Sequence, residues 1–316
     1  MEILEVSDLR MQYRSLCEYL VSAGSEVEPR GRPTHELTDV AIVLPGPEAA
    51  TFPTKIGRKA SPAILAAELM QWIAGVSDLQ QLNSVSADRF KNYSDNGATL
   101  YGAYGPRAYR GLARAVRVLQ QDTLSRQASV SLWRSLESTE TADLPCTLSW
   151  SFKIRNDALE MMTVMRSNDV WTGVAYDIPS MARIQSALAW ALDVEPGRYT
   201  HVAQSLHIYA SDVAKIARLH ETSMPLEDDD ARAPLLAPVD EDVPKVPTER
   251  WEILRDHWAR AAMHSALIPT RLPREFQWYA RQLEEHVGYD YFCDSCRYYL
   301  PQPELICQSH ITLVAP

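Results

Sequence analysis

The stretch Asp143–Asp177 reads DLPCTLSWSFKIRNDALEMMTVMRSNDVWTGVAYD, and it decides how the rest of the chain is interpreted. It contains two strand-like runs, Thr147–Ile154 and Leu159–Met165, in which apolar residues recur at short intervals. The residues between them, Arg155–Asp157, have the composition of a turn. Two such runs joined by a short polar turn predict a β-hairpin.

Reactive side chains gather at one end of this hairpin. Cys146 precedes the first run, Arg166 and Asp169 follow the second run, and Asp177 comes shortly afterwards. A guanidinium beside a cysteine stabilises the thiolate, and a thiolate can add covalently to an electron-poor ring carbon. A cysteine in front of a strand is more often a plain core residue, but the segment around Arg166 favours a site at this edge of the sheet.

The composition restricts the classes of function that the chain can have. With 316 residues, of which 46% are apolar, it can bury a sizeable core as one large domain or two small ones. The formal net charge of -10 argues against a general nucleic-acid surface, so an anionic substrate would need a local arginine cluster. No apolar run is long enough for a membrane span. Five cysteines and no signal-like N-terminus predict free thiols in a cytoplasmic protein.

Apolar spacing and the residues that interrupt it predict the other elements. The expected helices are Val6–Ala23, Pro62–Ile73, Arg107–Gln121, Ile178–Leu192, Ala210–Leu219, Glu249–Ala266 and Pro273–His286. The further expected strands are Val40–Leu44, Ser129–Trp133 and Gly197–Ala210. Arginines at 107, 110, 114 and 117 recur along one of these helices, which is typical of a solvated basic face.

Two other segments contain residues that could carry chemistry. Glu68 lies in the otherwise apolar helix Pro62–Ile73, so burial is expected to raise its pKa and suit it to relay protons. Near the C-terminus, the pairs Cys293-x-x-Cys296 and Cys307-x-x-His310 have a spacing that would suit zinc. The alternative is a small aromatic-rich tail with buried thiols, and no metal site is predicted there.

Five motifs in this order resemble the thymidylate synthase superfamily and its pyrimidine hydroxymethylase relatives. They are AAELMQWIAG around Glu68, YSDNGATLYGAYGPR from Tyr93 to Arg107, LPC at Cys146, RSxDxxxG from Arg166 to Gly173, and SLHIY ending at Tyr209. The resemblance covers roughly Arg30 to Tyr209. It implies an α/β fold of the α+β type, in which helices surround a large mixed sheet, and a homodimer.

This resemblance implies a division of the chain into three parts. Residues 1–220 would form the catalytic core. Residues 221–248, which include the acidic and proline-rich segment Glu221–Pro247, would form a loop. Residues 249–316 would form a helical extension packed on the same domain.

The resemblance also implies roles for individual residues. Cys146 would attack ring carbon 6 of a pyrimidine nucleoside monophosphate, and Glu68 would organise water and proton transfer. Asp169 would contact and help activate 5,10-methylenetetrahydrofolate, near Gly173, Phe90 and Tyr93. The remaining substrate contacts would come from Arg30, Arg126, Arg166, Ser167 and Asn168 around the phosphate and base, and from His207 and Tyr209 at the sugar. Arg126 would reach the site of the partner subunit, and Gln127 replaces a second arginine that the family carries there.

One departure from the family points to the base that is recognised. Synthases carry asparagine where this chain has Asp177, and asparagine suits the edge of uracil. Cytosine reverses that edge, so a carboxyl group can accept from its amino group and share a proton with ring nitrogen 3. Aspartate at this position resembles the cytidylate (dCMP or CMP) 5-hydroxymethylases. The simpler alternative is an aspartate that caps the helix beginning near Ile178.

The sequence therefore predicts a folate-dependent transferase that hydroxymethylates CMP or dCMP. Phe90 and Tyr93 stand about where synthases carry tryptophans, and a changed wall there could admit water to the reaction. Two alternatives stay open, which are a synthase that methylates dUMP and a non-catalytic nucleotide-binding descendant. Folate and a pyrimidine nucleotide are the expected ligands, and neither nucleic acid nor membrane is expected as a partner.

Overall fold

The computed structural model describes residues 1–50, 61–86, 88–138, 140–219 and 245–263, together with two short strands at 292–293 and 298–299. The strands are β1 (Glu2–Glu5), β2 (Ser25–Val27), β3 (Thr34–Leu44), β4 (Ser129–Ser131), β5 (Thr147–Arg155), β6 (Ala158–Met165), β7 (Asn168–Asp169), β8 (Glu195–Tyr209), β9 (Phe292–Cys293) and β10 (Tyr298–Tyr299). The helices are α1 (Leu9–Ala23), α2 (Pro62–Ala74), α3 (Leu79–Ser86), α4 (Tyr104–Gln121), α5 (Ala175–Leu192), α6 (Ala210–Ile216) and α7 (Pro247–Met263). Short helical turns lie at Pro29–Gly31, Pro47–Ala49, Lys91–Tyr93 and Val170–Val174.

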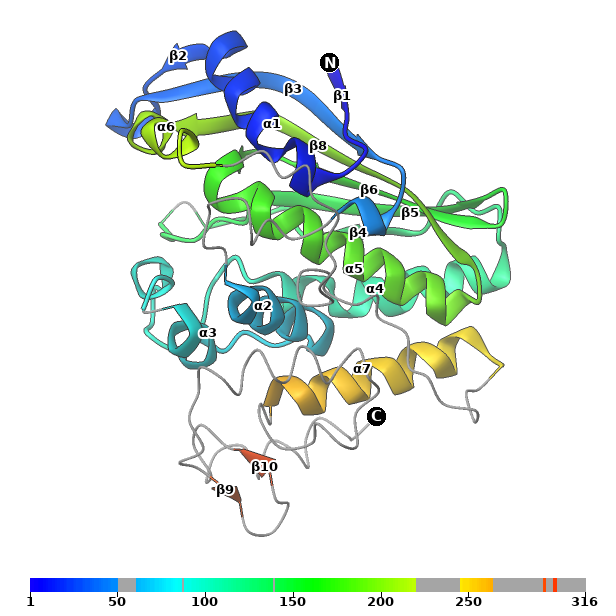
Figure 1. Ribbon diagram of the computed structural model, residues 1–316. Helices are drawn as coiled ribbons and strands as arrows, with labels where there is room; N and C mark the ends of the chain where they lie inside the picture. The colour runs from blue at the N-terminus through cyan, green and yellow to red at the C-terminus, as the bar shows by residue number, and fades with distance from the viewer. Residues whose placement is uncertain are drawn as a thin grey trace.

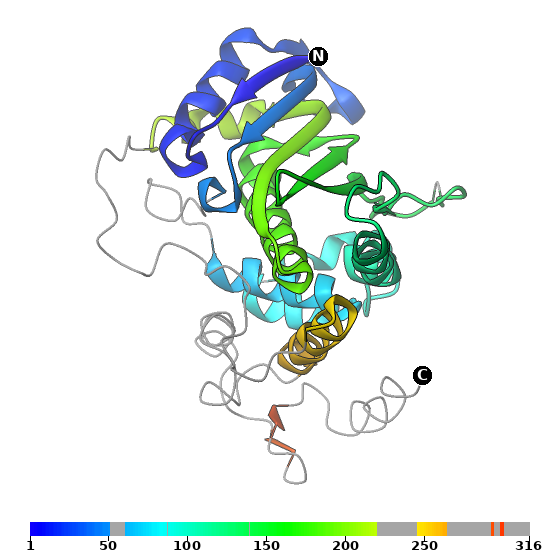
Figure 2. The ribbon, with the colours of Figure 1, turned by 90° about the vertical axis from the view of Figure 1, so that its right-hand side faces the viewer.

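Within these residues, eight strands form one mixed sheet in the order β1-β3-β8-β6-β5-β4, with β2 beside β3 and β7 beside β8. β6 runs parallel to β8, whereas β5 is antiparallel to β6 and β3 is antiparallel to β8. Figure 1 shows α5 running along the sheet, α2 and α4 beyond it, and α7 as the outermost helix. The turned view in Figure 2 shows the same succession of layers. The predicted fold, a large mixed sheet with surrounding helices, is confirmed.

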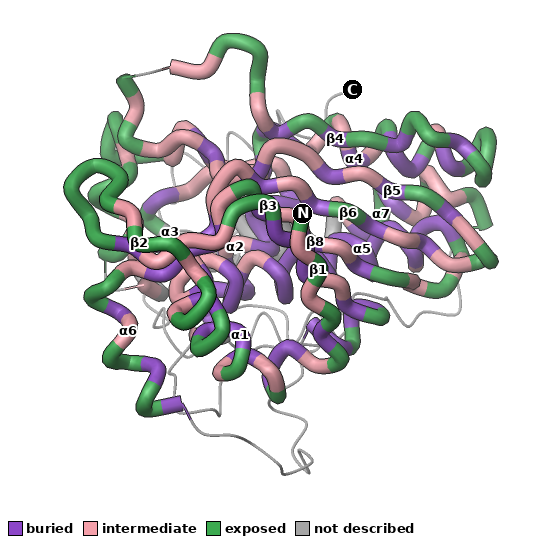
Figure 3. Tube along the Cα trace, turned by 90° about the horizontal axis from the view of Figure 1, so that it is seen from above, coloured by how far each residue is buried: buried purple, intermediate pink, exposed green. Residues whose placement is uncertain are grey.

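The hairpin predicted from the sequence is formed by β5 and β6. Asn156 and Asp157 in its turn have φ angles of 51° and 58°, and two consecutive positive φ angles are what a tight two-residue hairpin turn requires. Side chains then alternate between the two faces of the sheet, so that Trp150 and Met161 are buried while Met162 is exposed. Figure 3 shows this alternation of buried and exposed residues along the strands.

Strand β3 is longer than the sequence predicts. It begins at Thr34 rather than at Val40, and its first residues pair with the end of β8, for example Glu36 with His207. These first residues are mostly polar, so they carry no apolar signal of a strand. The extended β8 provides backbone partners, and this tertiary pairing outweighs the weak local preference.

Helix α4 does not present a uniform solvated basic face, because Arg107 is buried. Its guanidinium donates to Glu137 at 2.5 Å and to the carbonyl oxygens of Leu132 and Tyr101 at 2.8 and 3.0 Å. The side chains of Arg107 and Glu137 are only 1% and 4% exposed, and the ion pair lowers the pKa of Glu137 to about 2. The pair therefore ties α4 to the segment that follows β4.

Replacing Arg107 by leucine is expected to lower the free energy of unfolding by about 3–5 kcal/mol, because it leaves Glu137 as a buried charge without its cation. Urea unfolding of the purified protein measures this loss. Arg110→Leu is the matched control, since Arg110 lies one turn along the same helix and is exposed. Equal stabilities for the two variants would show that the buried pair does not hold this segment in place.

Helix α7 packs against α2, α4 and α5 and adds Trp251 and Leu254 to the hydrophobic core. Arg250 fixes its first turn by donating to the carbonyl of Trp190 at 3.1 Å and to Asp193 at 2.8 Å. Most of residues 221–248 and 264–316 lie outside the described residues, including the expected helix Pro273–His286. The three-part division of the chain therefore stays a prediction.

The metal and membrane expectations bear on only part of the chain. The described residues contain no group of three or more His, Cys, Asp or Glu side chains arranged to hold a metal ion. Cys296, Cys307 and His310 lie outside those residues, and of Cys293 only its place in β9 is described. None of the described helices is both long and apolar enough to cross a membrane.

Candidate active site

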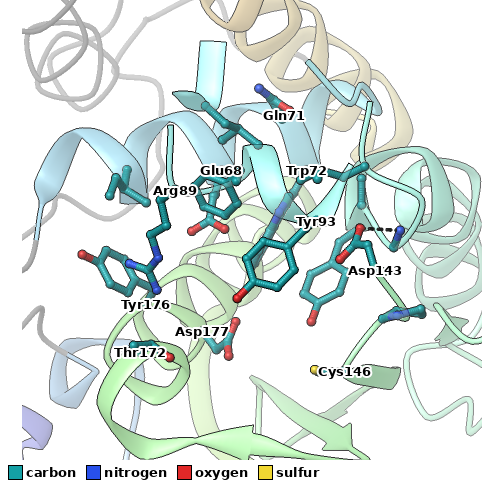
Figure 4. A pocket seen from close by; sticks show the side chains of 18 of the residues that line it. Glu68, Gln71, Trp72, Arg89, Tyr93, Asp143, Cys146, Thr172, Tyr176 and Asp177 are labelled. Atoms are coloured by element: carbon teal, nitrogen blue, oxygen red, sulfur yellow. Dashed lines mark hydrogen bonds between the residues drawn. The ribbon is translucent and has the colours of Figure 1, made fainter. Parts of the chain in front are cut away.

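A cavity of about 280 Å³ lies between α2, the segment 89–104, the residues before β5 and the start of α5. It collects five of the residues singled out in the sequence, namely Glu68, Phe90, Tyr93, Cys146 and Asp177. Figure 4 shows the sulfur of Cys146 and the carboxyl group of Asp177 facing the same open space, with the side chains of Glu68 and Arg89 above Asp177. The cavity therefore combines a nucleophile, two carboxyl groups and a cation.

Cys146 is a free, half-buried thiol at the start of β5. Nη2 of Arg166 lies 3.7 Å from its sulfur, while the same guanidinium donates to the carbonyls of Pro145 and Leu144 at 3.0 and 3.1 Å. Arg166 is therefore fixed beside the thiol, as the sequence indicates. Burial nevertheless raises the pKa of Cys146 by more than Arg166 and Arg30 lower it, and the charge of Asp177 raises it further. Without ligands the thiol is thus mainly protonated at neutral pH.

Glu68 and Asp177 share the interior of the cavity, and burial dominates the behaviour of both. Desolvation raises the pKa of Glu68 to about 8 and that of Asp177 to about 7. The charge of Asp177 raises the pKa of Glu68 further, whereas the guanidinium of Arg89 lowers the pKa of both groups. Two carboxyl groups whose pKa values lie close to neutral pH can hold and exchange protons during a reaction.

The stability of the protein without ligands is expected to fall as the pH rises from about 4.5 to about 8. Glu68 has a raised pKa in the folded state, so the folded protein holds its proton over a pH range in which the unfolded chain has already lost it. The stabilisation is complete below the unfolded pKa and is lost as the pH rises through about 8. Urea unfolding at pH 5 and pH 8 should show this fall, and Glu68→Gln should reduce it. An identical fall in wild type and variant would contradict the raised pKa of Glu68.

Asn168 does not line the cavity but lies behind Asp177. It is 3% exposed, and its Nδ2 donates to Oδ2 of Asp177 at 2.6 Å. Its Oδ1 lies 3.2 Å from Nε2 of His201 on β8. The sequence places Asn168 among the residues that contact substrate, whereas in the structure its amide is already engaged by two protein groups. Asp177 lies inside the first turn of α5, and the capping position is taken by Val174.

Arg30 and Arg32 precede β3, and His207 and Tyr209, which the resemblance assigns to the sugar, lie at the end of β8. His207 is buried and faces Ser167, whose Oγ lies 3.5 Å from Nδ1, and its ring packs edge-on against Tyr209 at 5.2 Å. The guanidinium of Arg32 stacks on Tyr209 at 3.7 Å. Arg30 is exposed and adopts a left-handed backbone conformation with a φ of 57°, and its charge reaches the thiol of Cys146. Arg30 and Arg166 are thus cations that act on the thiol of Cys146.

Three expected site residues are placed elsewhere. Arg126 is exposed and lines a separate pocket of about 210 Å³ with Ser151 and Arg198, on the sheet face opposite α5. Asp169 turns its carboxylate toward the helical turn Val170–Val174, where it accepts from the backbone nitrogen of Trp171 at 2.9 Å and bonds the hydroxyl of Thr172. Gly173 lies in the same turn and does not line the cavity.

The structure adds residues that the sequence did not single out. Tyr104 and Asp143 line the cavity beside Cys146. The hydroxyl of Tyr104 accepts a bond from the backbone nitrogen of Thr147 at 3.2 Å, and Asp143 accepts from that of Gly102 at 2.7 Å. Arg89 is an exposed cation that also lines the cavity and lowers the pKa of both Glu68 and Asp177. Tyr104 lies within the motif Tyr93–Arg107, and the glycine content of that motif is the signal that could have found it.

One wall of the cavity suits a flat aromatic ligand such as a folate ring. The rings of Trp72, Phe90 and Tyr93 lie along it, with the aliphatic side chains of Val76 and Leu82 between them. Apolar and aromatic surfaces of this kind commonly line sites for cofactors with extended rings. These residues fit the ring system of methylenetetrahydrofolate, whereas Asp169 and Gly173 would reach such a ligand only if their turn moved.

Comparisons of the sequence with known proteins identify a matching family and two similar proteins. A family model described as thymidylate synthase matches residues 11–227. The deoxyuridylate hydroxymethyltransferase of Bacillus phage SP01 is 30% identical over 219 residues, which cover 63% of this chain and 57% of that protein. The deoxyuridylate hydroxymethyltransferase of Pseudomonas phage M6 is 28% identical over 206 residues, which cover 61% of this chain and 58% of that protein. The chain thus spans little more than half the length of these two relatives.

Proposed function

Because the chain belongs to the thymidylate synthase family, we propose that it transfers a one-carbon unit from methylenetetrahydrofolate to ring carbon 5 of a cytidine monophosphate, CMP or dCMP, and leaves a hydroxymethyl group there. One observation supports this choice of base above all. The carboxyl group of Asp177 faces the cavity beside Cys146, and its neighbour Asn168 already satisfies one of its oxygens.

The hydrogen-bonding edge of the base favours cytosine over uracil as the partner of Asp177. Cytosine presents an amino group at ring position 4 and a bare nitrogen at position 3, so it needs one acceptor and one donor in the protein. Asp177 in its protonated form offers both, and burial keeps the pKa of Asp177 near 7, so a large fraction is protonated at neutral pH. Uracil carries a hydrogen on nitrogen 3 and an oxygen at position 4, so an ionised carboxyl group offers no donor to that oxygen, and a protonated one would have to carry its hydrogen on the opposite oxygen from the one that serves cytosine.

The residues of the cavity have complementary roles in the proposed reaction. Cys146 adds through sulfur to ring carbon 6, and its proton passes to a neighbouring base as the carbon–sulfur bond forms. Protonation of ring nitrogen 3 by Asp177 draws electrons from the ring and favours this addition. Methylenetetrahydrofolate, when bound, supplies the one-carbon unit that becomes attached to carbon 5. The hydrogen on carbon 5 leaves as a proton, water provides the hydroxyl group on the exocyclic carbon, and the carbon–sulfur bond breaks to restore the thiol of Cys146. Glu68, protonated near neutral pH, would organise this water and proton transfer.

Water has access to the side of the cavity where the one-carbon unit would arrive. Tyr93, at the rim of the aromatic wall, is 49% exposed, and Arg89 beside it is also exposed. An open wall favours addition of water to the exocyclic carbon over transfer of a hydride, which needs a closed and dry site. Both relatives reported above are named hydroxymethyltransferases, which supports the same outcome.

We also propose that the active protein is a homodimer formed through the sheet face opposite α5. Arg126 lies on this face and is too far round the sheet to line the cavity of its own chain. Met162 on the same face is 42% exposed, as expected for an apolar side chain that a second subunit would cover. In such a dimer Arg126 could contribute to the phosphate site of the partner.

The second candidate is hydroxymethylation of deoxyuridylate. It is favoured by the two phage relatives, both of which are named deoxyuridylate hydroxymethyltransferases. This activity would use the same thiol and folate wall, but Asp177 would then have to accept from the hydrogen on ring nitrogen 3. The two candidates differ only in the base.

The test is to incubate the protein with methylenetetrahydrofolate and, separately, with CMP, dCMP, UMP and dUMP, and to determine the product masses. We expect a hydroxymethyl group on a cytidylate with tetrahydrofolate as the second product, and the preferred nucleotide identifies the sugar. A hydroxymethylated uridylate would support the second candidate. A methylated uridylate with dihydrofolate would identify a synthase, and no product with any nucleotide would favour a binding protein.

A further inference from the structure

A chain of buried polar side chains runs from the sheet to Asp177 on the side away from the cavity. Asn168 bonds Asp177, His201 lies 3.2 Å from Asn168, and the hydroxyl of Tyr199 lies 3.0 Å from Nδ1 of His201. Tyr199 also lies 3.1 Å from Oγ1 of Thr163 on the neighbouring strand β6. Tyr199 and His201 are two residues apart on β8, so both point toward α5. We call Tyr199, His201 and Asn168 the relay.

We propose that His201 is a positioning residue that fixes the orientation of the Asn168 amide and so makes Asp177 present its proton to the cavity, which selects the edge of cytosine. This inference rests on the proposed role of Asp177 at the nucleotide base. It concerns groups behind the cavity, none of which would touch the substrate.

The first step concerns the bond between Asn168 and Asp177. In the structure the nitrogen of the Asn168 amide faces Asp177 and donates to its Oδ2 at 2.6 Å. The carbonyl oxygen of the same amide must then face His201. This orientation holds only if His201 offers a hydrogen at Nε2, because two facing acceptors would repel each other.

The second step concerns the tautomer of His201. The ring is completely buried, and this burial lowers its pKa to about 3, so the ring is neutral and carries a single hydrogen. With that hydrogen at Nε2, Nδ1 must accept, and the hydroxyl of Tyr199 at 3.0 Å is the available donor. The hydroxyl of Tyr199 also lies 3.1 Å from Oγ1 of Thr163 and 3.5 Å from Sδ of Met181, so its single hydrogen can be given to Nδ1 of His201 or to one of these two acceptors. When it is given to His201, the hydrogens of the relay all point toward Asp177.

The third step concerns the proton of Asp177 itself. Oδ2 of Asp177 accepts from Asn168, so the other oxygen is the favoured place for a proton, and from there it can be offered to ring nitrogen 3. If residue 201 could not donate, the amide of Asn168 would be free to turn over. Its oxygen would then face Asp177 and hold the proton on the inner side, which leaves a bare acceptor toward the cavity. A bare acceptor suits the hydrogen on nitrogen 3 of uracil and not the lone pair of cytosine.

The backbone around Asn168 is shaped to allow this bond. A Cβ atom added at Gly173 would lie 2.6 Å from Nδ2 of Asn168 and 3.0 Å from Oδ2 of Asp177. A residue with a side chain at this position would therefore push the two groups apart. The charged groups that act on Asp177 are Arg89, Asp169 and Glu68.

The test compares substitutions at His201 by kcat/KM for a cytidylate and for the matching uridylate. His201→Leu removes the donor, and we expect the ratio of the two values to shift toward the uridylate by about 10-fold or more, the effect of leaving one buried polar partner unmatched. His201→Gln should restore most of the ratio, because its amide nitrogen can donate to Asn168 from a similar position. Tyr199→Phe should shift the ratio in the same direction by a smaller factor.

Gln185→Leu is the matched control for a general loss of packing. Gln185 is completely buried on α5, and its amide donates to the carbonyls of Leu159, Gly197 and Arg198 at 2.7, 2.8 and 3.3 Å rather than to a side chain of the relay. We expect this variant to lose stability without a change in the ratio. Equal losses for both nucleotides in His201→Leu, or no difference between His201→Leu and His201→Gln, would overturn the inference.

Failure of the inference can be separated from failure of the proposed function. The wild-type product assay decides the function alone, because it identifies the base that is modified. Dissociation constants of the His201 variants for cytidylate and uridylate, measured without folate, decide the relay alone. A wild-type cytidylate preference that His201→Leu leaves intact would retain the function and reject the relay.

Discussion

Replacing Cys146 by serine is expected to abolish product formation, with a loss in kcat of at least about 10³-fold, because a serine hydroxyl is a much weaker nucleophile than a thiolate. The thiol is the sulfur that faces the cavity, and Arg166 is held beside it at 3.7 Å. Release of tritium from ring position 5, measured with folate present, reports loss of the hydrogen at carbon 5, which requires that the thiol has first added to carbon 6. The variant should release none above background.

The control for this experiment is Cys17→Ser. Cys17 is completely buried in α1 and does not line the cavity. Its substitution tests the cost of exchanging a buried sulfur for a hydroxyl, without touching the site. Nucleotide binding by Cys146→Ser should persist, since the phosphate and base contacts are unchanged. A Cys146→Ser protein that still formed a covalent adduct would show that another residue is the nucleophile.

The elements that the sequence predicts well are those whose signals are local. The hairpin of β5 and β6 follows from apolar runs and a polar turn, and Asn156 and Asp157 tolerate the left-handed conformation that the turn requires. The same holds for the helix around Glu68, because an isolated carboxylate in an apolar helix is recognisable without its partners. The meeting of Cys146 with Asp177 could be expected from the resemblance, in which both residues belong to motifs of one site.

The features that were missed depend on contacts between distant segments. Arg107 shares its spacing with three exposed arginines, and only Glu137, 30 residues later, explains why this one is buried. His201 is one polar residue in a strand, and its partner Asn168 is 33 residues away. The pKa of Cys146 was expected to fall beside Arg166, but the burial that outweighs this effect is a property of the whole fold. Pairwise chemistry can be inferred from motifs, whereas burial and long-range pairing require the structure.

Replacing Asp177 by asparagine is expected to reverse the base preference of the enzyme. An amide cannot deliver a proton to ring nitrogen 3, so kcat/KM for the cytidylate should fall by about 10³-fold, a loss typical of a mismatched buried polar edge. The amide of residue 177 would keep its bond to Asn168 through its oxygen. Its nitrogen would then offer a hydrogen to the oxygen at position 4 of uracil, and activity on the uridylate should rise.

The measurement is the ratio of kcat/KM for the two nucleotides in wild type, Asp177→Asn and Asp177→Ala. Alanine removes both oxygens of the side chain, so it should weaken the activity on both nucleotides and create no new preference for either base. The asparagine variant should also lose the part of the pH dependence that comes from Asp177, whose pKa is about 7. The sign of that loss is specific, since a group that must be protonated to act makes the wild-type cytidylate activity fall as the pH rises above about 7. If Asp177→Asn retained the cytidylate preference, base selection would have to lie with other polar residues of the cavity, such as Glu68, Arg89, Tyr104 or Asp143.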